Sequence, residues 1–426
     1  MIRSSATLQI ARALESGVHD WVLQGFAPAY GKKQFAADAR WQALQRAGSE
    51  LWLDTGDIDA AGKLWTREFR ALTTNNTLLN KEVQRGQYDY LVRRTAKHLR
   101  SLEPGIPEKL LVLEIAFVLN AWHGLRLVER FDAFVSVEEH TDLADDIELA
   151  VLYAKRLHAI CPQRFIVKLP LTPAGLLAMR RLRRDGVPIN FTLGFSARHN
   201  WLAARVGDPT FVNVFLGRLN AFAADSGLGS GDGVGEKAAL ASQEGIRELR
   251  QGKQAATRQI AASMRNGDQV WTLAGVDVLT MPTAVASDYH DAAKPPPAGP
   301  GPASTAVRPE VEPGALRRLH LECLWDVAET FRRAVDALCR QDLDRLAGAD
   351  LVRILRENGV TDLFPEYTPQ ELEQIRKDGK IPKLERWQER LERGTAALDS
   401  LINLAGLLSF ATDQEQLDAR VRGLLV

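Results

Sequence analysis

The chain has 426 residues, of which 45% are hydrophobic and 25% are charged, as in an ordinary globular protein with a sizeable core. Its 54 Lys and Arg residues balance its 54 Asp and Glu residues. Because proteins that bind nucleic acid or an anionic membrane surface usually carry a basic excess, we expect neither kind of partner.

We expect neither a membrane-spanning segment nor a secretory signal. No stretch approaches the ~20 uncharged apolar residues that cross a bilayer, and the first residues, MIRSS, precede no apolar signal core. The cysteines, Cys161, Cys323 and Cys339, are scattered and form no CxxC pattern, and the eight histidines form no HxH or HExxH cluster. These patterns predict buried free thiols, no metal site and a cytoplasmic protein.

Four segments follow one another along the chain. Residues 1–50 are predicted to be helical with polar breaks, whereas residues 51–290 alternate short apolar runs with helical patterns. Such alternation predicts a parallel sheet with crossover helices. Residues 291–314 are rich in Pro, Ala and Gly, which predicts a semi-rigid or disordered linker, and residues 315–426 are again helical.

Inside the second segment, residues 141–160 are predicted to form one amphipathic helix and residues 165–169 a strand. Thr172 suits the cap of the next helix, and Gly186 suits its exit. Further strands are predicted over 187–193, 211–215 and 276–281, and Ser196 is expected to open another helix.

The strand over 187–193 places Asn190 and Thr192 on the face opposite to its apolar side chains. Polar side chains on the inner face of a central strand are costly unless they line a site. We therefore expect these two residues to face a binding cavity.

Lys168 lies in the middle of an apolar strand pattern. Burial disfavours the ammonium form and leaves some free amine, which attacks carbonyl groups to form a Schiff base. On spacing alone, the pattern favours the simpler explanation, a lysine whose charge reaches the strand end or pairs with a carboxylate.

Three more polar residues follow apolar runs in the same way: Asp54, Asn75 and Glu138. Taken singly, each suits a turn, a helix cap or a surface position. Each also lies at or near the end of a predicted strand, where parallel barrels place their active sites. Their repetition indicates a shared site.

These residues stand in a series of motifs that resembles the transaldolases. The motifs keep the family's order over residues 50–285, and the C-terminal stretch 409–417, SFATDQEQL, is similar to the family's closing helix. The matching pieces are LDTGD (53–57), TTN (73–75), SVE (136–138), IVKLPLT (166–172), INFTL (189–193), FLGR (215–218) and SMR (263–265).

The resemblance implies a (β/α)8 TIM barrel over residues 51–290, with added N-terminal helices and a C-terminal helical extension. It implies a transferase of carbohydrate metabolism, in the pentose phosphate pathway, that needs no cofactor. A dihydroxyacetone unit would pass from a ketose phosphate, sedoheptulose 7-phosphate or fructose 6-phosphate, to an aldose phosphate. These phosphorylated sugars are the expected partners, and a homodimer is left open.

The resemblance also assigns roles to residues. Lys168 would form the Schiff base, Asp54 would act as the general base, and Glu138 and Thr192 would hold a water that carries protons. The residues expected to bind substrate are Asn75, Asn190, Asn213, Phe215, Arg218, Ser263 and Arg265, with the two arginines and Ser263 at the phosphate.

The chain departs from the family pattern at two positions. The family's Thr-Asn-Pro reads Thr74-Asn75-Asn76 here, which predicts a looser loop, and Asn213 stands where many members have a phosphate-binding serine. The helices over 315–395 exceed what the family needs, and a lid, an assembly surface and a non-catalytic role stay open. Two other functions also stay open: a specialised aldolase with a different acceptor, and a non-catalytic sugar-phosphate-binding barrel.

Overall fold

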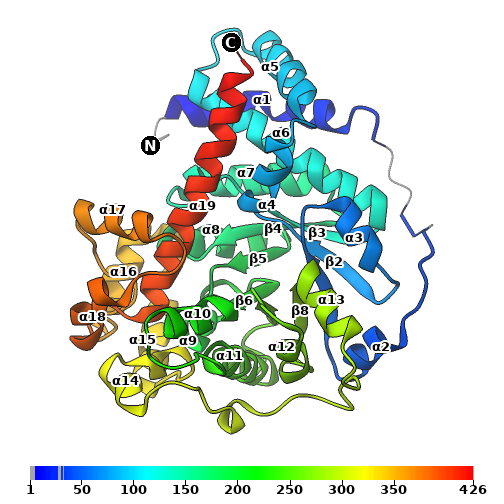
Figure 1. The fold of residues 1–426 in the computed structure, drawn as a ribbon. Helices are drawn as coiled ribbons and strands as arrows, with labels where there is room; N and C mark the ends of the chain where they lie inside the picture. The colour runs from blue at the N-terminus through cyan, green and yellow to red at the C-terminus, as the bar shows by residue number, and fades with distance from the viewer. Residues whose placement is uncertain (1–4, 27–29, 32, 426) are drawn as a thin grey trace.

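The structure, a computed structural model, describes residues 5–26, 30–31 and 33–425. Eight parallel strands close into a barrel in sequence order, with helices between them (Figure 1). This arrangement confirms the predicted (β/α)8 barrel. The strands are β1 Glu50–Asp54, β2 Phe69–Thr73, β3 Phe134–Glu138, β4 Phe165–Pro170, β5 Ile189–Thr192, β6 Phe211–Phe215, β7 Arg258–Ala262 and β8 Val278–Pro282.

Helices surround the barrel and extend it at both ends of the chain. Before β1 lie α1 Ser5–Leu23 and α2 Ala39–Arg46. Between and after the strands lie α3 Ile58–Leu64, α4 Asn76–Gln84, α5 Asp89–Leu102, α6 Glu108–Phe131, α7 Ile147–Ile160, α8 Pro173–Arg184, α9 Ala197–Gly207, α10 Leu216–Asp225, α11 Val234–Gln251, α12 Gly267–Thr272 and α13 Thr283–Asp291. The C-terminal helices are α14 Pro313–Arg318, α15 Glu329–Cys339, α16 Gly348–Glu357, α17 Pro369–Asp378, α18 Leu384–Glu392 and α19 Leu398–Gly423.

The register of the strands brings the polar strand-end residues to one rim. Glu138 pairs with Lys168 across β3 and β4, and Lys168 pairs with Asn190 across β4 and β5. Asp54 pairs with Thr73 across β1 and β2. Because all strands run parallel around a closed barrel, their carboxyl ends meet at the same end, where barrel enzymes place their sites.

The turns after β4 and β5 form as their residues predict. The Thr172 hydroxyl accepts a hydrogen bond from the backbone N–H of Gly175, 2.8 Å away, and caps α8. Gly186 adopts φ +81° directly after α8, a conformation that glycine reaches without strain. Ser196 caps α9 in the same way through the N–H of His199.

The helix predicted over 141–160 is shorter than expected. A single 3-10 turn covers Thr141–Leu143, and α7 begins only at Ile147. Asp146 caps α7 by accepting a hydrogen bond from the N–H of Leu149, at 3.0 Å. The cap at Asp146 therefore outweighs the apolar periodicity that runs through the turn before it.

Helix α6 is long and apolar enough to cross a membrane by length and composition. However, 83% of its apolar window is buried inside the fold. The carboxylate of Glu114, on this helix, forms two hydrogen bonds of 2.7 and 2.6 Å with the guanidinium of Arg156 on α7. Packing against the barrel accounts for the apolar character of α6.

The Pro-rich segment over 291–314 is held along the outside of the barrel. The Trp271 indole N–H donates to the carbonyl of Pro295 at 2.7 Å, and the Gly301 N–H donates to the carbonyl of Ala274 at 2.6 Å. Further on, the Ser304 hydroxyl donates to the carboxylate of Glu244. These contacts give the segment a fixed path to the C-terminal helices.

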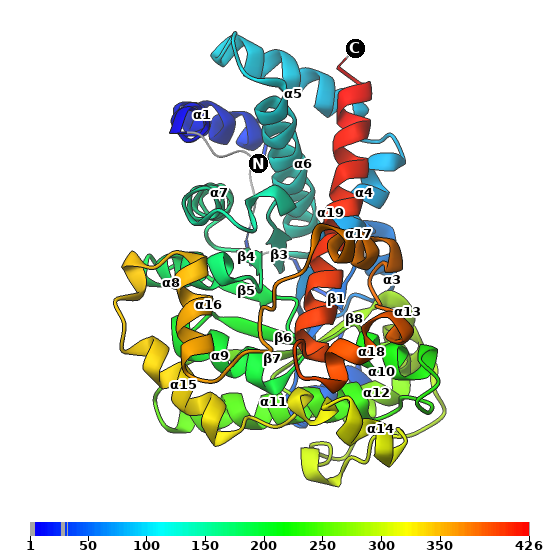
Figure 2. The same cartoon turned by 90° about the vertical axis from the view of Figure 1, so that its left-hand side faces the viewer.

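Helix α19 lies across the carboxyl ends of the strands and continues past the barrel to α4 and α6 (Figures 1 and 2). The Asn403 amide donates to the carbonyls of Leu171 and Leu193, which follow β4 and β5. One turn earlier, Asp399 pairs with Arg198 of α9 at 2.7 Å. The C-terminal helix is therefore fixed over the end of the barrel that carries the polar residues.

Candidate active site

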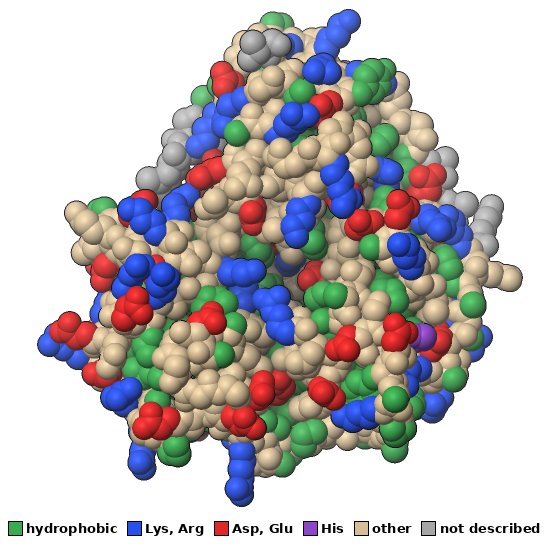
Figure 3. All heavy atoms as spheres, in the orientation of Figure 1, with side chains coloured by type: hydrophobic (Ala, Val, Ile, Leu, Met, Phe, Trp, Pro, Cys, Tyr) green, Lys and Arg blue, Asp and Glu red, His purple; other side chains and the backbone are tan. Residues whose placement is uncertain are grey.

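A cavity of 470 Å³ opens at the carboxyl ends of the strands, beneath α19. On the face drawn in Figure 3, Lys and Arg side chains border a hollow near the middle. Most residues expected at the site line this cavity, while Glu138 and Thr192 lie outside its lining. The expected residues that line it are Asp54, Asn75, Lys168, Asn190, Asn213, Phe215, Arg218, Ser263 and Arg265.

Lys168 lies on β4 and is only 3% exposed. Its Nζ donates a hydrogen bond of 3.2 Å to the carbonyl of Thr74 and lies 3.6 Å from Oε1 of Glu138. The ring centre of Phe410 is 5.7 Å from the same nitrogen. A buried amine that lines a cavity, beside a carboxylate, is placed to attack a carbonyl group.

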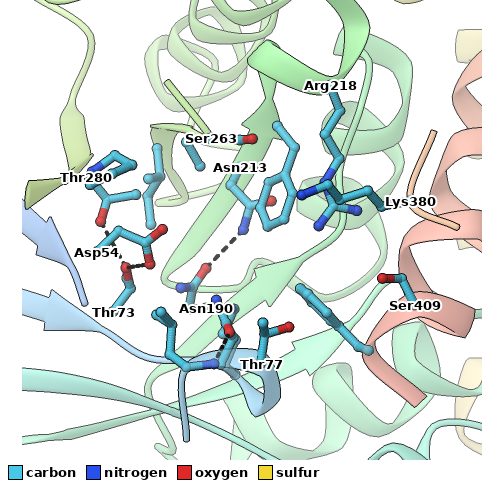
Figure 4. Close-up of a pocket in the computed structure, with 18 of the residues that line it drawn as sticks. Asp54, Thr73, Thr77, Asn190, Asn213, Arg218, Ser263, Thr280, Lys380 and Ser409 are labelled. Atoms are coloured by element: carbon cyan, nitrogen blue, oxygen red, sulfur yellow. Dashed lines mark hydrogen bonds between the residues drawn. The ribbon is translucent and has the colours of Figure 1, made fainter. Parts of the chain in front are cut away.

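Asp54, at the end of β1, lines the cavity with its carboxylate. Its Oδ1 accepts a hydrogen bond of 2.7 Å from the Thr73 hydroxyl, which also lies 2.9 Å from the Thr280 hydroxyl (Figure 4). Burial raises the pKa of Asp54 above its ordinary value, although Lys168 and the Thr73 hydrogen bond oppose the shift. A raised pKa suits a carboxyl group that takes and returns a proton near neutral pH.

Glu138, at the end of β3, is held by a neighbouring loop. Its Oε2 accepts a hydrogen bond of 3.0 Å from the backbone N–H of Asn76, and the Asn76 amide donates to the carbonyl of Glu139. Burial raises the pKa of Glu138, while Lys168 and the Asn76 N–H oppose the shift. A proline at position 76 would have no N–H to donate. Asn76 thus ties the loop to β3 through its backbone N–H and its side-chain amide.

Three asparagines line the cavity from three different elements. Asn75 caps α4, its Oδ1 accepting a hydrogen bond of 2.8 Å from the N–H of Leu78. The Asn190 amide donates to the Ser136 hydroxyl at 3.1 Å, and its oxygen accepts from Asn213 at 3.2 Å (Figure 4). These bonds fix the side-chain orientations of the three asparagines.

The Thr192 hydroxyl is buried and has no hydrogen-bond partner within the part of the chain that the structure describes. Thr192 lies on β5, two residues beyond Asn190 and therefore on the same face of the strand. Buried hydroxyls nearly always have a partner, which is often an ordered water. The Thr192 hydroxyl therefore lies beside Asn190 with its hydrogen-bonding capacity unused by the described residues.

Arg218 and Arg265 lie close together because Gly217 packs tightly on the loop after β7. A Cβ atom at Gly217 would lie 2.2 Å from the Ser263 carbonyl oxygen and 2.8 Å from Cγ of Arg265. Burial and the charge of Arg265 lower the pKa of Arg218 to about 10. The Arg218 guanidinium lies 5.1 Å from the ring centre of Phe215. Two adjacent arginines, one of them buried, form an environment that favours an anion.

Other lining residues were not expected from the sequence. Phe410 and Ser409 come from α19, Thr73 and Thr280 come from β2 and β8, and Lys380 comes from the loop after α17. Ser409 and Phe410 belong to the C-terminal motif over 409–417. The contact between Phe410 and Lys168 depends on the path of α19, which the motif does not reveal. Lys380 carries no motif at all.

The chain is similar to proteins of one known family. The model of the family described as transaldolase/fructose-6-phosphate aldolase matches residues 51–323. The chain is 28% identical to a transaldolase of Xanthomonas campestris over 234 residues, which cover 54% of this chain and 71% of the relative. It is 29% identical to a transaldolase of Prochlorococcus marinus over 236 residues, 54% of this chain and 69% of the relative. A probable transaldolase of Thermus thermophilus is 39% identical over 142 residues, 33% of this chain and 57% of the relative.

Proposed function

Since the chain belongs to the transaldolase/fructose-6-phosphate aldolase family, we propose that it transfers a dihydroxyacetone unit between sugar phosphates through a Schiff base on Lys168. One observation carries the proposal: the buried amine of Lys168 and the cations Arg218 and Arg265 line the same cavity. A ketose phosphate has its carbonyl at one end and its dianion at the other, so the two features match the two ends of one substrate.

The reaction starts at the amine. Lys168 Nζ attacks the C2 carbonyl of the ketose phosphate, and loss of water gives a protonated imine. Asp54 then takes the proton of the C4 hydroxyl, the C3–C4 bond breaks, and its electrons pass into the imine to form an enamine. The shortened aldose phosphate leaves, and the three-carbon unit stays on Lys168. Because the protonated imine accepts the electron pair, these steps need no metal and no organic cofactor.

The second half runs in reverse with another aldehyde. The enamine attacks the carbonyl carbon of an aldose phosphate, Asp54 returns its proton to the new hydroxyl, and water releases the ketose. Glu138, 3.6 Å from the amine, and the unpaired Thr192 hydroxyl would hold the water that carries protons as the imine forms and breaks. Asn75 and Asn190 would bind the hydroxyls of the three-carbon unit, with Asn213 holding Asn190 in place.

The burial of Asp54 supports its role as the group that moves the proton. A carboxyl group with an ordinary pKa is a weak base at neutral pH, and catalysis improves as the pKa approaches the working pH. Desolvation raises the pKa of Asp54 in this direction. The Thr73 hydroxyl keeps the carboxylate oriented toward the cavity.

A transfer assay tests the proposal against simple aldol cleavage. The purified chain is incubated with fructose 6-phosphate, with and without erythrose 4-phosphate, and sedoheptulose 7-phosphate and glyceraldehyde 3-phosphate are measured. A transaldolase forms both products only when the acceptor is present. Release of glyceraldehyde 3-phosphate and free dihydroxyacetone without an acceptor would instead identify an aldolase.

The Lys168→Met variant, which keeps the length of the side chain but removes the amine, is the control and should form neither product. A panel of aldose phosphates with fructose 6-phosphate as the donor then identifies the preferred acceptor. Absence of both products with every donor and acceptor would contradict the proposal and favour a non-catalytic sugar-phosphate-binding barrel.

A further inference from the structure

Lys380 reaches the cavity from the C-terminal helical region, far along the chain from the barrel strands. It lines the cavity together with Arg218 and Arg265. In Figure 4 its side chain points toward the Arg218 guanidinium, at the end of the cavity away from Asp54 and Thr280. Arg218 and Lys380 therefore lie together at the end of the cavity opposite to Asp54, the proposed proton-transfer group.

Within the described part of the chain, these three cations form no ion pair with a carboxylate. Across the described ranges 5–26, 30–31 and 33–425, none of the three forms an ion pair within 4 Å. The buried Nη1 of Arg218 also lacks a hydrogen-bond partner there. Gly406 of α19 leaves room for this nitrogen, because a Cβ atom at position 406 would lie 2.8 Å from it. Converging positive charges that form no ion pair are costly unless an anion binds between them.

Burial and nearby positive charges lower the pKa of Lys380. Burial lowers the pKa of Lys380, and Arg265, Arg218 and Lys81 lower it further, while Asp413 opposes the shift. Asp413 itself accepts a hydrogen bond from the Thr77 hydroxyl. The environment of Lys380 is thus dominated by positive charge, which a bound dianion would offset.

The turn that presents Lys380 is built around a buried carboxylate. The Asp378 side chain is only 1% exposed and accepts hydrogen bonds from Arg386, from the Gln374 amide at 3.1 Å and from the Lys383 N–H at 3.2 Å. Gly379 has φ +75°, a backbone conformation that L side chains rarely adopt. Lys380 therefore stands on a fixed turn rather than on a free loop.

The turn is also fixed to the helix that closes the cavity. Arg376, near the end of α17, forms an ion pair of 2.9 Å with Glu415 of α19. Since α19 carries Phe410 over Lys168, the same helix supports both ends of the cavity. Lys380 thus lines the cavity from a segment that is held against α19, outside the barrel.

We propose that Lys380 binds the phosphate of the substrate as a third cation, beside Arg218 and Arg265, and makes the site selective for phosphate dianions. The identity of the phosphorylated sugar rests on the proposed function, whereas the anion site itself does not. It also gives a role to the helices that exceed the barrel: they deliver Lys380 to the cavity.

Binding of inorganic phosphate to the full-length chain tests the inference without turnover. Isothermal titration calorimetry is compared for the wild type and for Lys380→Met, Lys380→Arg and Lys377→Met. Loss of a charged hydrogen bond at a partly exposed group should weaken phosphate binding roughly tenfold in Lys380→Met. Lys380→Arg should restore most of the affinity. Lys377→Met serves as the matched control, because Lys377 lies on the same segment and pairs with Glu373 at 3.6 Å.

Steady-state kinetics provide the second measurement. In Lys380→Met, the loss of kcat/KM with fructose 6-phosphate should be roughly tenfold larger than the loss with fructose, and it should lie mainly in KM. Phosphate affinity equal to that of the wild type in Lys380→Met, or a wild type that binds no phosphate, would overturn the inference.

The two proposals fail separately. If phosphate binding depends on Lys380 but no sugar phosphate is turned over, the proposed function is wrong and the anion site stands. If turnover is observed while Lys380→Met binds phosphate unchanged, the proposed function stands and the role of Lys380 is wrong.

Discussion

Replacement of Asp399 by Asn should destabilise the protein strongly, because Asp399 fixes the cavity-closing helix to the barrel. Its side chain is fully buried and accepts hydrogen bonds of 2.7 Å from the Ser196 hydroxyl and of 2.7 and 2.8 Å from the Arg198 guanidinium. Removal of one member of a buried ion pair costs about 3–5 kcal/mol, because the remaining charge stays buried without its partner. Arg198 keeps one partner, Asp362 at 2.9 Å, so we expect about 3 kcal/mol.

Thermal unfolding at pH 7 measures this loss. For a chain of 426 residues the unfolding entropy converts 1 kcal/mol into about 1 °C, so Asp399→Asn should lower the Tm by about 3 °C. Asp362→Asn is the matched control, because it removes the other carboxylate from the same arginine, and that carboxylate is 27% exposed. Partly exposed pairs contribute at most about 1 kcal/mol, so the control should lower the Tm by about 1 °C or less.

The effect should depend on pH in a defined direction. Burial alone would raise the pKa of Asp399, but Arg198, His199 and Ser196 outweigh it and hold the pKa well below its ordinary value. A depressed pKa in the folded state gives stability that is present above the unfolded value of about 3.9 and is lost as the pH falls below it. The difference between wild type and Asp399→Asn should be largest above about pH 5. Equal Tm losses in Asp399→Asn and Asp362→Asn, or a difference that grows toward pH 3, would refute this reasoning.

Three further predictions concern the reaction centre. Thr192→Val removes a buried hydroxyl that has no partner within the described residues. The free energy of unfolding should therefore stay within about 1 kcal/mol of the wild-type value. The kcat should fall roughly tenfold or more. Thr73→Val, whose hydroxyl has two partners, should instead lose stability in urea titrations. Asn76→Pro fits the first turn of α4 but deletes the N–H that holds Glu138, so kcat should fall roughly tenfold. Asn76→Ala keeps the N–H and should lose less kcat. Equal losses of kcat in the two variants would contradict this role of the N–H. The kcat of the wild type should fall with decreasing pH as Asp54 is protonated. The midpoint of this fall should lie above the ordinary pKa of an aspartate, because burial raises the pKa of Asp54. Asp54→Asn should be about 100-fold slower or worse at every pH.

Much of the reaction centre could be predicted because it follows from strand ends. Asp54, Glu138 and Lys168 each interrupt or end an apolar run, and a parallel barrel brings such residues to one rim whatever its loops do. The alternation in β5 likewise assigned Asn190 and Thr192 to the inner face. The motif order then distinguished a shared site from unrelated turn and cap residues.

Features that depend on distant packing could not be predicted. Lys380 reaches the cavity only because α17 lies on α19, and neither the path of α19 nor the turn around Asp378 has a local signature in the sequence. The bond from Asn76 to Glu138 uses a backbone N–H, which no side-chain pattern reveals. At the start of α7, apolar periodicity extended the predicted helix through a 3-10 turn, although the cap at Asp146 begins the helix at Ile147.

Borohydride trapping on Lys168 tests the central claim most directly. The full-length chain is mixed with fructose 6-phosphate, reduced, and analysed by intact mass and peptide mapping. We expect the mass of one reduced dihydroxyacetone unit on the peptide that contains Lys168, and no adduct in Lys168→Met. Absence of an adduct with every ketose phosphate, or an adduct that persists in Lys168→Met, would contradict the account.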